Sequence, residues 1–288
     1  MTTAGARGAH AWQVWAYLVA APLEETASGR LWEAGTVGVE TREEPDGRVR
    51  VEGWFGGETA GDPLAAWEDR GVERLGARRV VEDDWLAAYR EKARPFALGR
   101  AFWVDPGEPD APAGGEVPAG RRLLRLPART AFGIGSHEST RLAVELLEEA
   151  PVAGRRVLDV GTGTGVLTFA ALALGAASAV AFDVDVGALA QASANAALNG
   201  FAPSLFTGVT ESLRPAPRFE LALVNIIPEI IVPEIPAIAR LLTAKGQMIL
   251  SGILAGRGDE VLAAAATAGF AERARRQDGE WVSFRVGR

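Results

Sequence analysis

The segment from Val157 to Asp183 restricts the fold of this chain more than any other. An apolar run over 157–160 leads into Gly161-Thr-Gly-Thr-Gly165, and the next apolar run ends at Asp183. Glycine lets the backbone turn sharply after a strand and approach a ligand with no Cβ in the way. Nucleotide-binding α/β units place an acidic side chain at the end of the next strand, where it binds ribose hydroxyls. The segment therefore predicts a strand, a tight turn, a helix and a second strand, with a nucleotide site at the strand ends.

The spacing of the glycines narrows the choice of cofactor. It is G-x-G-x-G over residues 161–165, whereas dinucleotide-binding units use G-x-G-x-x-G. This spacing favours a ligand with an adenosine but no pyrophosphate, which is S-adenosylmethionine rather than NAD. We expect Gly161, Gly163 and Gly165 beneath the methionine half of that cofactor, and Asp183 on its ribose. A nicotinamide-dependent dehydrogenase is the weaker alternative.

Strands and helices alternate from Ser139 to the end of the chain, which is typical of parallel βαβ units. The last two strands, over 272–276 and 281–286, are joined by Asp278-Gly279 and indicate an antiparallel hairpin. A mostly parallel sheet that ends in a reversed strand predicts a class I methyltransferase fold, a Rossmann-like α/β fold with a seven-stranded sheet. Before the hairpin, we expect strands at 156–160, 179–183, 204–207, 221–226 and 247–251, with helices that include 139–149 and 187–198.

The first third of the chain has a different pattern. Its expected order is β-α-β-β-α-β, which is ferredoxin-like, with Asp62 capping a second helix over 62–71 and a last strand at 78–81. Extended segments at 96–104 and 122–126 then flank a loop rich in proline and glycine. We predict a small α+β domain over residues 1–90, a linker and irregular segment over 91–120, and a cofactor-binding catalytic domain over 121–288.

Composition excludes several other classes of protein. The chain has no cysteine and only two histidines, so disulfides, thiolate metal sites and a histidine-rich metal site are not expected. No apolar run approaches the roughly 20 residues of a membrane helix, and no secretory signal is evident, so we expect a cytoplasmic protein. Residues 1–90 carry 10 basic and 16 acidic side chains, whereas residues 91–288 carry 20 and 21. The acidic first third suits a basic protein partner better than bare nucleic acid, although acidic surfaces also simply keep proteins soluble.

Three polar residues are candidates for the site. Asn225 follows four apolar residues at a strand end, and its amide can donate and accept while it orients an incoming amine; a turn-making role is the alternative. Asp159 either reaches the amino group of the cofactor through a water or ties down the glycine loop. Asp183 has helix capping as its alternative role, for which Asp185 is the better candidate.

The loop before the helix at 139–149 contains two glycines and several hydroxyl groups. Its ordinary function would be capping, with Ser136 or Ser139 satisfying the start of the helix. His137 lies in the same loop and is expected to be structural or solvated.

Four motifs lie in order over residues 129–255. They are Phe132-Gly-Ile-Gly-Ser-His-Glu-Ser-Thr140, Val157-Leu-Asp-Val-Gly-Thr-Gly-Thr-Gly165, Asn225-Ile226 and Ser251-Gly-Ile-Leu254. In order and spacing they resemble the ribosomal protein L-11 methyltransferase family (PrmA), whereas the likeness over 1–90 rests on the α+β pattern and Gly38-Val39-Glu40. The resemblance implies an enzyme that uses S-adenosylmethionine to methylate lysine side-chain amines, and in some members the N-terminal amine, of that ribosomal protein. It also implies that the small first domain grips the substrate.

Motif positions carry over the family's cofactor contacts onto Thr140, Gly161, Asp183 and Asn225. The chain departs from the family pattern at Ile134, where threonine is usual, and also at Ser139, at Thr162 and Thr164, and at Ile227. These departures leave the substrate open. Asn225 is the candidate catalytic residue and no metal ligand is expected. The candidate cofactor-binding residues are Phe132, Thr140, Asp159, Gly161, Gly163, Gly165, Asp183 and Asn225.

Two alternatives stay open from the sequence. One is a class I methyltransferase that acts on another protein or on a small molecule, although a small molecule would need no separate gripping domain. The other is a non-catalytic module that binds S-adenosylmethionine and associates with the ribosome, which the polar residues at the motif positions disfavour. Nothing in the sequence suggests an obligate interface, a membrane or a direct requirement for nucleic acid, so we expect a monomer.

Overall fold

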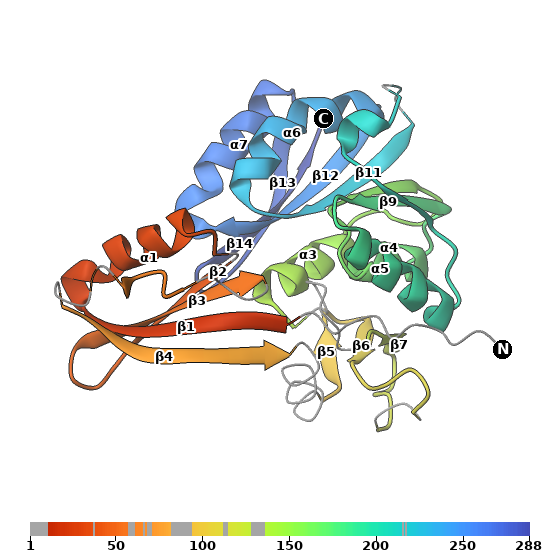
Figure 1. Ribbon diagram of the computed structural model, residues 1–288. Coiled ribbons are helices and arrows are strands. Elements are labelled where there is room, and N and C mark those ends of the chain that lie inside the picture. The colour runs from red at the N-terminus through yellow and green to blue at the C-terminus, as the bar shows by residue number, and fades with distance from the viewer. Residues whose placement is uncertain are drawn as a thin grey trace. The chain divides into compact units, whose positions relative to one another are not determined.

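The computed structural model of the chain separates into two compact units, Met1–Glu91 and Lys92–Arg288 (Figure 1). Each unit has its own sheet and its own hydrophobic core. The structure describes residues 11–36, 38–56, 61–65, 67, 71–81, 94–111, 115–127, 136–214, 216 and 218–288.

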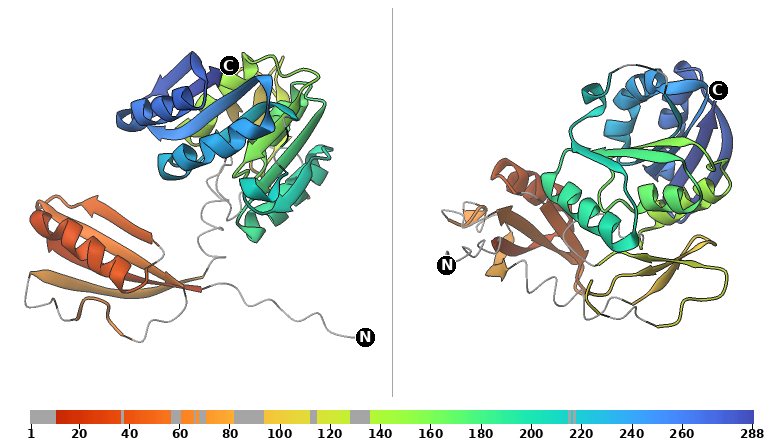
Figure 2. Two further views of the ribbon diagram at one scale, coloured as in Figure 1. Left: turned by 90° about the horizontal axis from the view of Figure 1, so that it is seen from above. Right: turned by 90° about the vertical axis from the view of Figure 1, so that its right-hand side faces the viewer.

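The first unit is a four-stranded antiparallel sheet in the order β2-β3-β1-β4, with helix α1 (Glu24–Glu33) across one face (Figure 2). Alternate side chains of a strand point to the same face, so Tyr17 and Val51 are buried in one core with Leu31 of α1. This strand order is that of the ferredoxin-like fold and confirms the class expected here. The strands are β1 (Ala11–Ala20), β2 (Gly38–Glu43), β3 (Arg48–Gly56) and β4 (Val72–Val81), and the 3-10 helix η1 (Ala21–Leu23) precedes α1.

Two details of this unit differ from the prediction. β4 begins at Val72, well before residue 78, because an irregularity at Gly76, whose φ is +136°, breaks the alternation that marks a strand in sequence. The helix expected over 62–71 is the second difference. Asp62 accepts a hydrogen bond from the Leu64 amide at 2.8 Å, as a cap does, but the described residues of this segment form short turns rather than an α-helix.

The second unit includes a small sheet of β5 (Phe96–Leu98), β6 (Phe102–Asp105) and β7 (Arg122–Arg125). β5 and most of β6 lie within the extended segment expected at 96–104, and β7 lies within the one expected at 122–126. The buried side chains of these strands, Leu98 and Phe102 among them, belong to the same core as helix α3 (Glu138–Glu148). Such apolar residues would be exposed to water in a linker, and their burial ties the segment to the second unit.

The main sheet of the second unit has seven strands in the order β10-β9-β8-β11-β12-β14-β13. The strands from β10 to β12 pair in parallel, and β14 is antiparallel to both β12 and β13. This arrangement confirms the predicted class I methyltransferase sheet with its terminal hairpin. The strands are β8 (Arg156–Val160), β9 (Ser178–Asp183), β10 (Ser204–Thr207), β11 (Phe219–Asn225), β12 (Leu242–Leu254), β13 (Ala271–Asp278) and β14 (Trp281–Gly287).

Helices cover both faces of this sheet (Figure 2). Neighbouring residues of β8 point to opposite faces, so Val157 packs with α3, α4 and α5, whereas Leu158 packs with α6 and α7. β8 has β9 on one side and β11 on the other, so the strand order reverses at β8. In open α/β sheets, ligands bind outside the carboxyl ends of the strands at such a point. The remaining helices are α4 (Val166–Ala173), α5 (Val186–Asn199), α6 (Pro228–Leu241) and α7 (Gly258–Thr267).

Candidate active site

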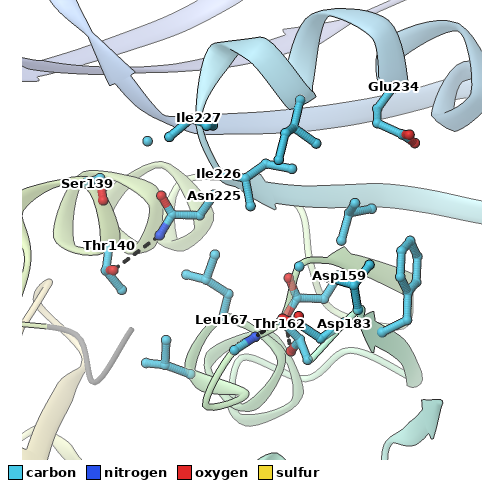
Figure 3. A pocket seen from close by; sticks show the side chains of 18 of the residues that line it. Ser139, Thr140, Asp159, Thr162, Leu167, Asp183, Asn225, Ile226, Ile227 and Glu234 are labelled. Carbon is cyan, nitrogen blue, oxygen red and sulfur yellow. Dashed lines mark hydrogen bonds between the residues drawn. The ribbon is translucent and has the colours of Figure 1, made fainter. Parts of the chain in front are cut away.

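A cavity of about 430 Å³ opens at the carboxyl ends of β8, β9 and β11 (Figure 3). Residues of the glycine loop, of the strand ends and of the first turns of α3 and α6 line it. Most of the lining is apolar, which is typical of a site for a small organic ligand with a few polar anchors. The polar lining side chains are His137, Ser139, Thr140, Asp159, Thr162, Asp183, Thr210, Asn225, Glu234 and Trp281.

The glycine loop leaves β8 and turns at Gly161 and Gly163, whose φ values are +70° and +54°. A Cβ at Gly161 would lie 2.8 Å from Cγ2 of Ile226, which is closer than packed carbon atoms approach. The amides of Gly161 and Thr162 both donate to the carbonyl of Phe182 at 3.0 Å, which joins the loop to β9. Both glycines therefore present bare backbone to the cavity.

Gly165 lies elsewhere. Its φ is +86° at the start of α4, where a Cβ would collide with the ring of Phe169. It is not among the residues that line the cavity. The packing of α4 therefore explains why residue 165 is a glycine, and we leave Gly165 out of the cofactor-binding residues proposed below.

Asp183 ends β9 and lines the cavity. Its Oδ2 accepts from the Gly163 amide at 2.9 Å and its Oδ1 from the Asp185 amide at 3.0 Å. The cap of α5 is Asp185, which accepts from the Gly187 amide at 2.7 Å, as predicted. Asp183 is therefore not used as a helix cap, and its oxygen atoms have further lone pairs for a ligand.

Asp159 is 1% exposed and its Oδ2 accepts from the hydroxyls of Thr162 at 2.7 Å and Thr168 at 2.6 Å. Burial raises the pKa of this carboxyl to about 6; the two threonine hydroxyls oppose the rise, and the nearby charge of Asp183 adds to it. These contacts support the reading in which Asp159 ties down the glycine loop. Asp159 also lines the cavity, so an indirect contact with the cofactor stays a prediction.

Asn225 and Thr140, which are far apart in sequence, meet in the cavity. The Nδ2 of Asn225 donates to Oγ1 of Thr140 at 3.2 Å, as Figure 3 shows. The Oδ1 of Asn225 is buried and has no hydrogen-bond partner. Buried polar atoms nearly always have a partner, so this oxygen fits a ligand or substrate that supplies a donor.

A pair of serines supports this end of the site. Ser251 is the register partner of Asn225 in the neighbouring strand, and its hydroxyl donates to the Ser139 carbonyl at 2.7 Å. It also contacts the hydroxyl of Ser283 at 2.6 Å, and both serines are fully buried. The first turn of α3, which carries Thr140, is thereby joined to β12 and β14.

The cap of α3 is His137, and the expectation of Ser136 or Ser139 was wrong. The Nδ1 of His137 accepts from the Ser139 amide at 3.2 Å, and the edge of its ring packs on Trp281 with the ring centres 4.6 Å apart. Trp281 of the β13–β14 hairpin thus supports the imidazole of His137, and the residues next to His137 in sequence do not indicate this contact. His137 serves here as a structural residue.

Two further cavity residues, Thr210 and Glu234, were not predicted from the sequence. Thr210 begins the 3-10 helix η3 (Thr210–Ser212) after β10, and Glu234 lies on α6. Both line the cavity, and each has a buried side-chain oxygen with no hydrogen-bond partner. Glu234 is the only charged residue between Ile230 and Ile238, which is the signal that the sequence offered.

Phe132, the remaining candidate, lies outside the described residues. Within the described ranges, no group of three or more His, Cys, Asp or Glu side chains is arranged to hold a metal ion. Among those same residues, no helix has the length and apolar character needed to cross a membrane.

Comparisons with known proteins agree with this fold. Residues 12–288 match the family described as "Ribosomal protein L11 methyltransferase (PrmA)". A protein named ribosomal protein L11 methyltransferase from Synechococcus elongatus is 32% identical over 286 residues, which cover 90% of this chain and 91% of that protein. A protein of the same name from Sorangium cellulosum is 37% identical over 260 residues, which cover 84% of this chain and 79% of that protein. The crystal structure of a ribosomal protein L11 methylase from Lactobacillus delbrueckii subsp. bulgaricus is 31% identical, with a TM-score of 0.62 over 68% of this chain and 99% of that one. The chain therefore belongs to the ribosomal protein L11 methyltransferase (PrmA) family.

Proposed function

We propose that this chain transfers methyl groups from S-adenosylmethionine to lysine side-chain amines of ribosomal protein L11, with the N-terminal amine as a further acceptor. The observation that carries the proposal is the contact between Thr140 and Asn225, which leaves one buried amide oxygen unpaired in the cavity. The family to which the chain belongs supports the choice of reaction and of acceptor protein.

The residues of the cavity fit this cofactor, which when bound supplies a methyl group on a cationic sulfonium. Asp183 lies at one end, where its carboxylate can accept from ribose hydroxyls. Gly161 and Gly163 line the cavity without a side chain, which would let the methionine half approach their backbone. Thr140 and Asn225 lie at the other end of the cavity (Figure 3), where the amine would meet the methyl group.

Thr140 sets the orientation of the Asn225 amide. Because Nδ2 donates to the threonine hydroxyl, Oδ1 is the atom left for the substrate. That oxygen accepts an N–H of the incoming amine and directs the nitrogen lone pair toward the methyl group. Alignment of this kind supplies a large share of the acceleration in a simple displacement.

Methyl transfer requires the neutral amine. Lysine has a pKa of about 10.4, so forming the neutral side chain at pH 7.5 costs about 4 kcal/mol. Among the described residues of the cavity, His137 is engaged as a helix cap and Asp159 accepts from two hydroxyls, so neither is placed to act as a base. We infer that the amine loses its proton to water before the substrate closes the cavity, and that the apolar lining then keeps it neutral.

The first unit supports a role in substrate recognition. It is a separate compact unit with a ferredoxin-like sheet, and residues 1–90 carry more acidic than basic side chains. An acidic surface attracts a basic protein substrate. We infer that residues 1–90 grip L11, that residues 121–288 methylate it, and that the chain acts as a cytoplasmic monomer without nucleic acid.

Mass spectrometry of purified L11 after incubation with this protein and S-adenosylmethionine tests the proposal. We expect mass gains of whole methyl groups at lysines or at the N-terminus, and none when the cofactor is omitted. If L11 gains no mass while calorimetry shows cofactor binding, the acceptor is another protein or a small molecule. Failure to methylate any amine would favour the non-catalytic module.

A further inference from the structure

Basic side chains gather at the edge of the main sheet where β11 begins, opposite the edge that holds the cavity. Three segments of the chain, residues 213–219, 239–247 and 284–288, contain six basic residues and no acidic one, whereas the whole chain has 30 basic and 37 acidic residues. Such an uneven distribution gives a positive potential at one place on a protein of negative net charge. The six cations, which we call the basic edge, are Arg214, Arg218, Arg240, Lys245, Arg285 and Arg288.

Hydrogen bonds bring the three segments together where α6 ends. The Arg218 amide donates to the Leu241 carbonyl at 2.9 Å, and the Arg218 guanidinium donates to the Arg214 carbonyl at 2.8 Å. The Arg288 guanidinium donates to the Ala239 carbonyl at 2.8 Å, and Figure 1 shows the C-terminus beside α6. The basic edge is therefore one surface built from three distant parts of the chain.

The basic edge has charges that acidic side chains do not neutralise. Within the described ranges, none of its six cations forms an ion pair with an acidic side chain. The acidic residues that adjoin the segments in the sheet already have partners, since Glu220 pairs with Arg156 and Glu272 pairs with Arg275. The exposed members of the basic edge are Arg214, Arg240, Lys245 and Arg288.

Capping of α6 explains only some of these cations. Basic side chains stabilise the C-terminus of a helix, and Arg240 lies in the last turn of α6 while Arg288 donates to its carbonyls. Arg214 and Lys245 donate no side-chain hydrogen bond to α6 among the described residues. Their charges are available to a partner.

The basic edge lacks the apolar centre that an interface with a folded protein has. Of the described residues, the large apolar side chains that are exposed lie outside the three segments; Val209 and Leu254 are the closest in sequence. The aromatic residues of the segments, Phe219 and Phe284, are 3% and 1% exposed, so they offer no ring on which a base could stack. Arginine guanidinium groups bind phosphates in a bidentate manner, and a chain of phosphates needs neither an apolar centre nor a stacking ring.

We propose that the basic edge binds the phosphate backbone of RNA without reading its sequence. This binding goes beyond the proposed function, in which methyl transfer itself needs no nucleic acid; only the choice of RNA over DNA rests on that function, because a ribosomal acceptor is associated with RNA. β11 has seven residues, so at roughly 3.3 Å per residue the basic edge lies about 20 Å from Asn225. The Debye length is about 8 Å at physiological ionic strength, so the carboxylates of the cavity are screened from the bound backbone.

Fluorescence anisotropy with a short labelled RNA duplex, repeated between about 50 and 200 mM salt, tests the proposal. The logarithm of the binding constant should fall against the logarithm of salt concentration with a slope of about −3 to −5, since each phosphate contact adds about −0.9. The triple variant Arg214→Gln, Arg240→Gln, Lys245→Gln should bind about 10-fold more weakly, with a slope shallower by about 2 to 3. It should keep the wild-type kcat on free L11.

The matched control is the triple variant Arg100→Gln, Arg122→Gln, Arg257→Gln, which removes the same charge from other places on the second unit. It should keep the wild-type affinity for RNA within about 2-fold. An equal loss of affinity in this control would show that net charge alone is responsible and would overturn the proposal. Binding that does not depend on salt, or no binding, would also overturn it.

Two further titrations of the wild-type protein separate the possible partners. Polyglutamate that binds as tightly as the RNA would assign the basic edge to an acidic protein, and a DNA duplex that binds more tightly would assign it to DNA; either result overturns the proposal. RNA binding is measured without S-adenosylmethionine, so its failure leaves the proposed methyl transfer intact. RNA binding by a protein that fails to methylate L11 would defeat the proposed function alone.

Discussion

The two ends of the cavity are held by different kinds of hydrogen bond. At the end near α3, neutral groups meet: the Asn225 amide contacts the Thr140 hydroxyl, and the Ser251 hydroxyl holds the carbonyl of Ser139. At the other end, carboxylates accept the bonds. Asp159 accepts from two threonine hydroxyls, and Asp183 accepts from two backbone amides.

We call the end with Asn225 and Thr140 the reaction end, and the end with Asp159 and Asp183 the cofactor end, after their proposed roles. The Asn225 amide and the Thr140 hydroxyl are neutral groups that do not titrate near neutral pH, so their contact does not change in charge with pH. The cofactor end contains Asp159, whose pKa is raised to about 6 by burial. Substitutions at the reaction end should therefore affect turnover, and substitutions at the cofactor end should affect stability and cofactor binding.

The largest effect is expected from Asn225→Ala at the reaction end. Loss of the amide oxygen removes the group that aligns the amine, so kcat should fall by about 100-fold or more. Cofactor affinity, measured by calorimetry on the same sample, should change much less. Thr140→Val keeps the amide and frees its orientation, so it should lower kcat by a smaller factor. Wild-type turnover by Asn225→Ala would refute the role of this residue.

At the other end, Asp159 should make stability depend on pH. The pKa of its carboxyl is about 6 in the folded chain against an ordinary value of 3.8, a difference worth about 3 kcal/mol. Because the folded value is the higher one, this contribution to stability is fully present below about pH 4 and is lost as the pH rises through about 6.

Urea unfolding of the wild-type protein and of Asp159→Asn measures this contribution. The asparagine does not titrate, so the free energy of unfolding of the wild type minus that of the variant should fall by about 3 kcal/mol between pH 4 and pH 7. Other carboxyl groups cancel in the difference. A difference that is constant with pH would show that Asp159 has no raised pKa.

Sequence spacing predicted the turn of the glycine loop and the Asp185 cap, but it did not predict what supports Asn225 and Thr140, for a physical reason. The glycine turn, Asp183 and the Asp185 cap depend on neighbours within one βαβ unit, and their residue types follow from backbone geometry. The support of the reaction end is long-range, since Ser251 and Ser139 are 112 residues apart. No local pattern reports such a contact.

The same distinction explains the errors elsewhere. His137 caps α3 with a side chain that packs on Trp281 of the last hairpin, whereas local propensity favours serine. Residues 96–98 and 102–104 fall within an extended segment that the sequence predicted, and their burial shows that they belong to the core of the second unit. The fold class was predictable because it depends on the order of strands and helices.

Ser251→Ala should produce a smaller effect than Asn225→Ala or Asp159→Asn, and it should affect both stability and turnover. It leaves the fully buried Ser283 hydroxyl without this partner and should lower the free energy of unfolding by about 1–3 kcal/mol. It also releases the Ser139 carbonyl beside Thr140, so kcat should fall several-fold. Ser283→Ala is the matched control: it keeps the bond to Ser139 and should lower stability while leaving kcat unchanged. A fall in kcat as large in the control would show that only stability is involved.

The smallest effect is expected from Asp185→Ala, which compares two adjacent carboxylates at the cofactor end. Loss of the α5 cap should lower the free energy of unfolding by about 1 kcal/mol and leave cofactor affinity unchanged. Asp183→Ala, in contrast, should weaken cofactor binding by about 10-fold or more, because a buried ribose hydroxyl loses its acceptor. Thermal unfolding and calorimetry on both variants separate the two roles. If Asp185→Ala also weakened binding by that factor, the cap and the ribose site would be a single unit, and the assignment of the ribose to Asp183 alone would be wrong.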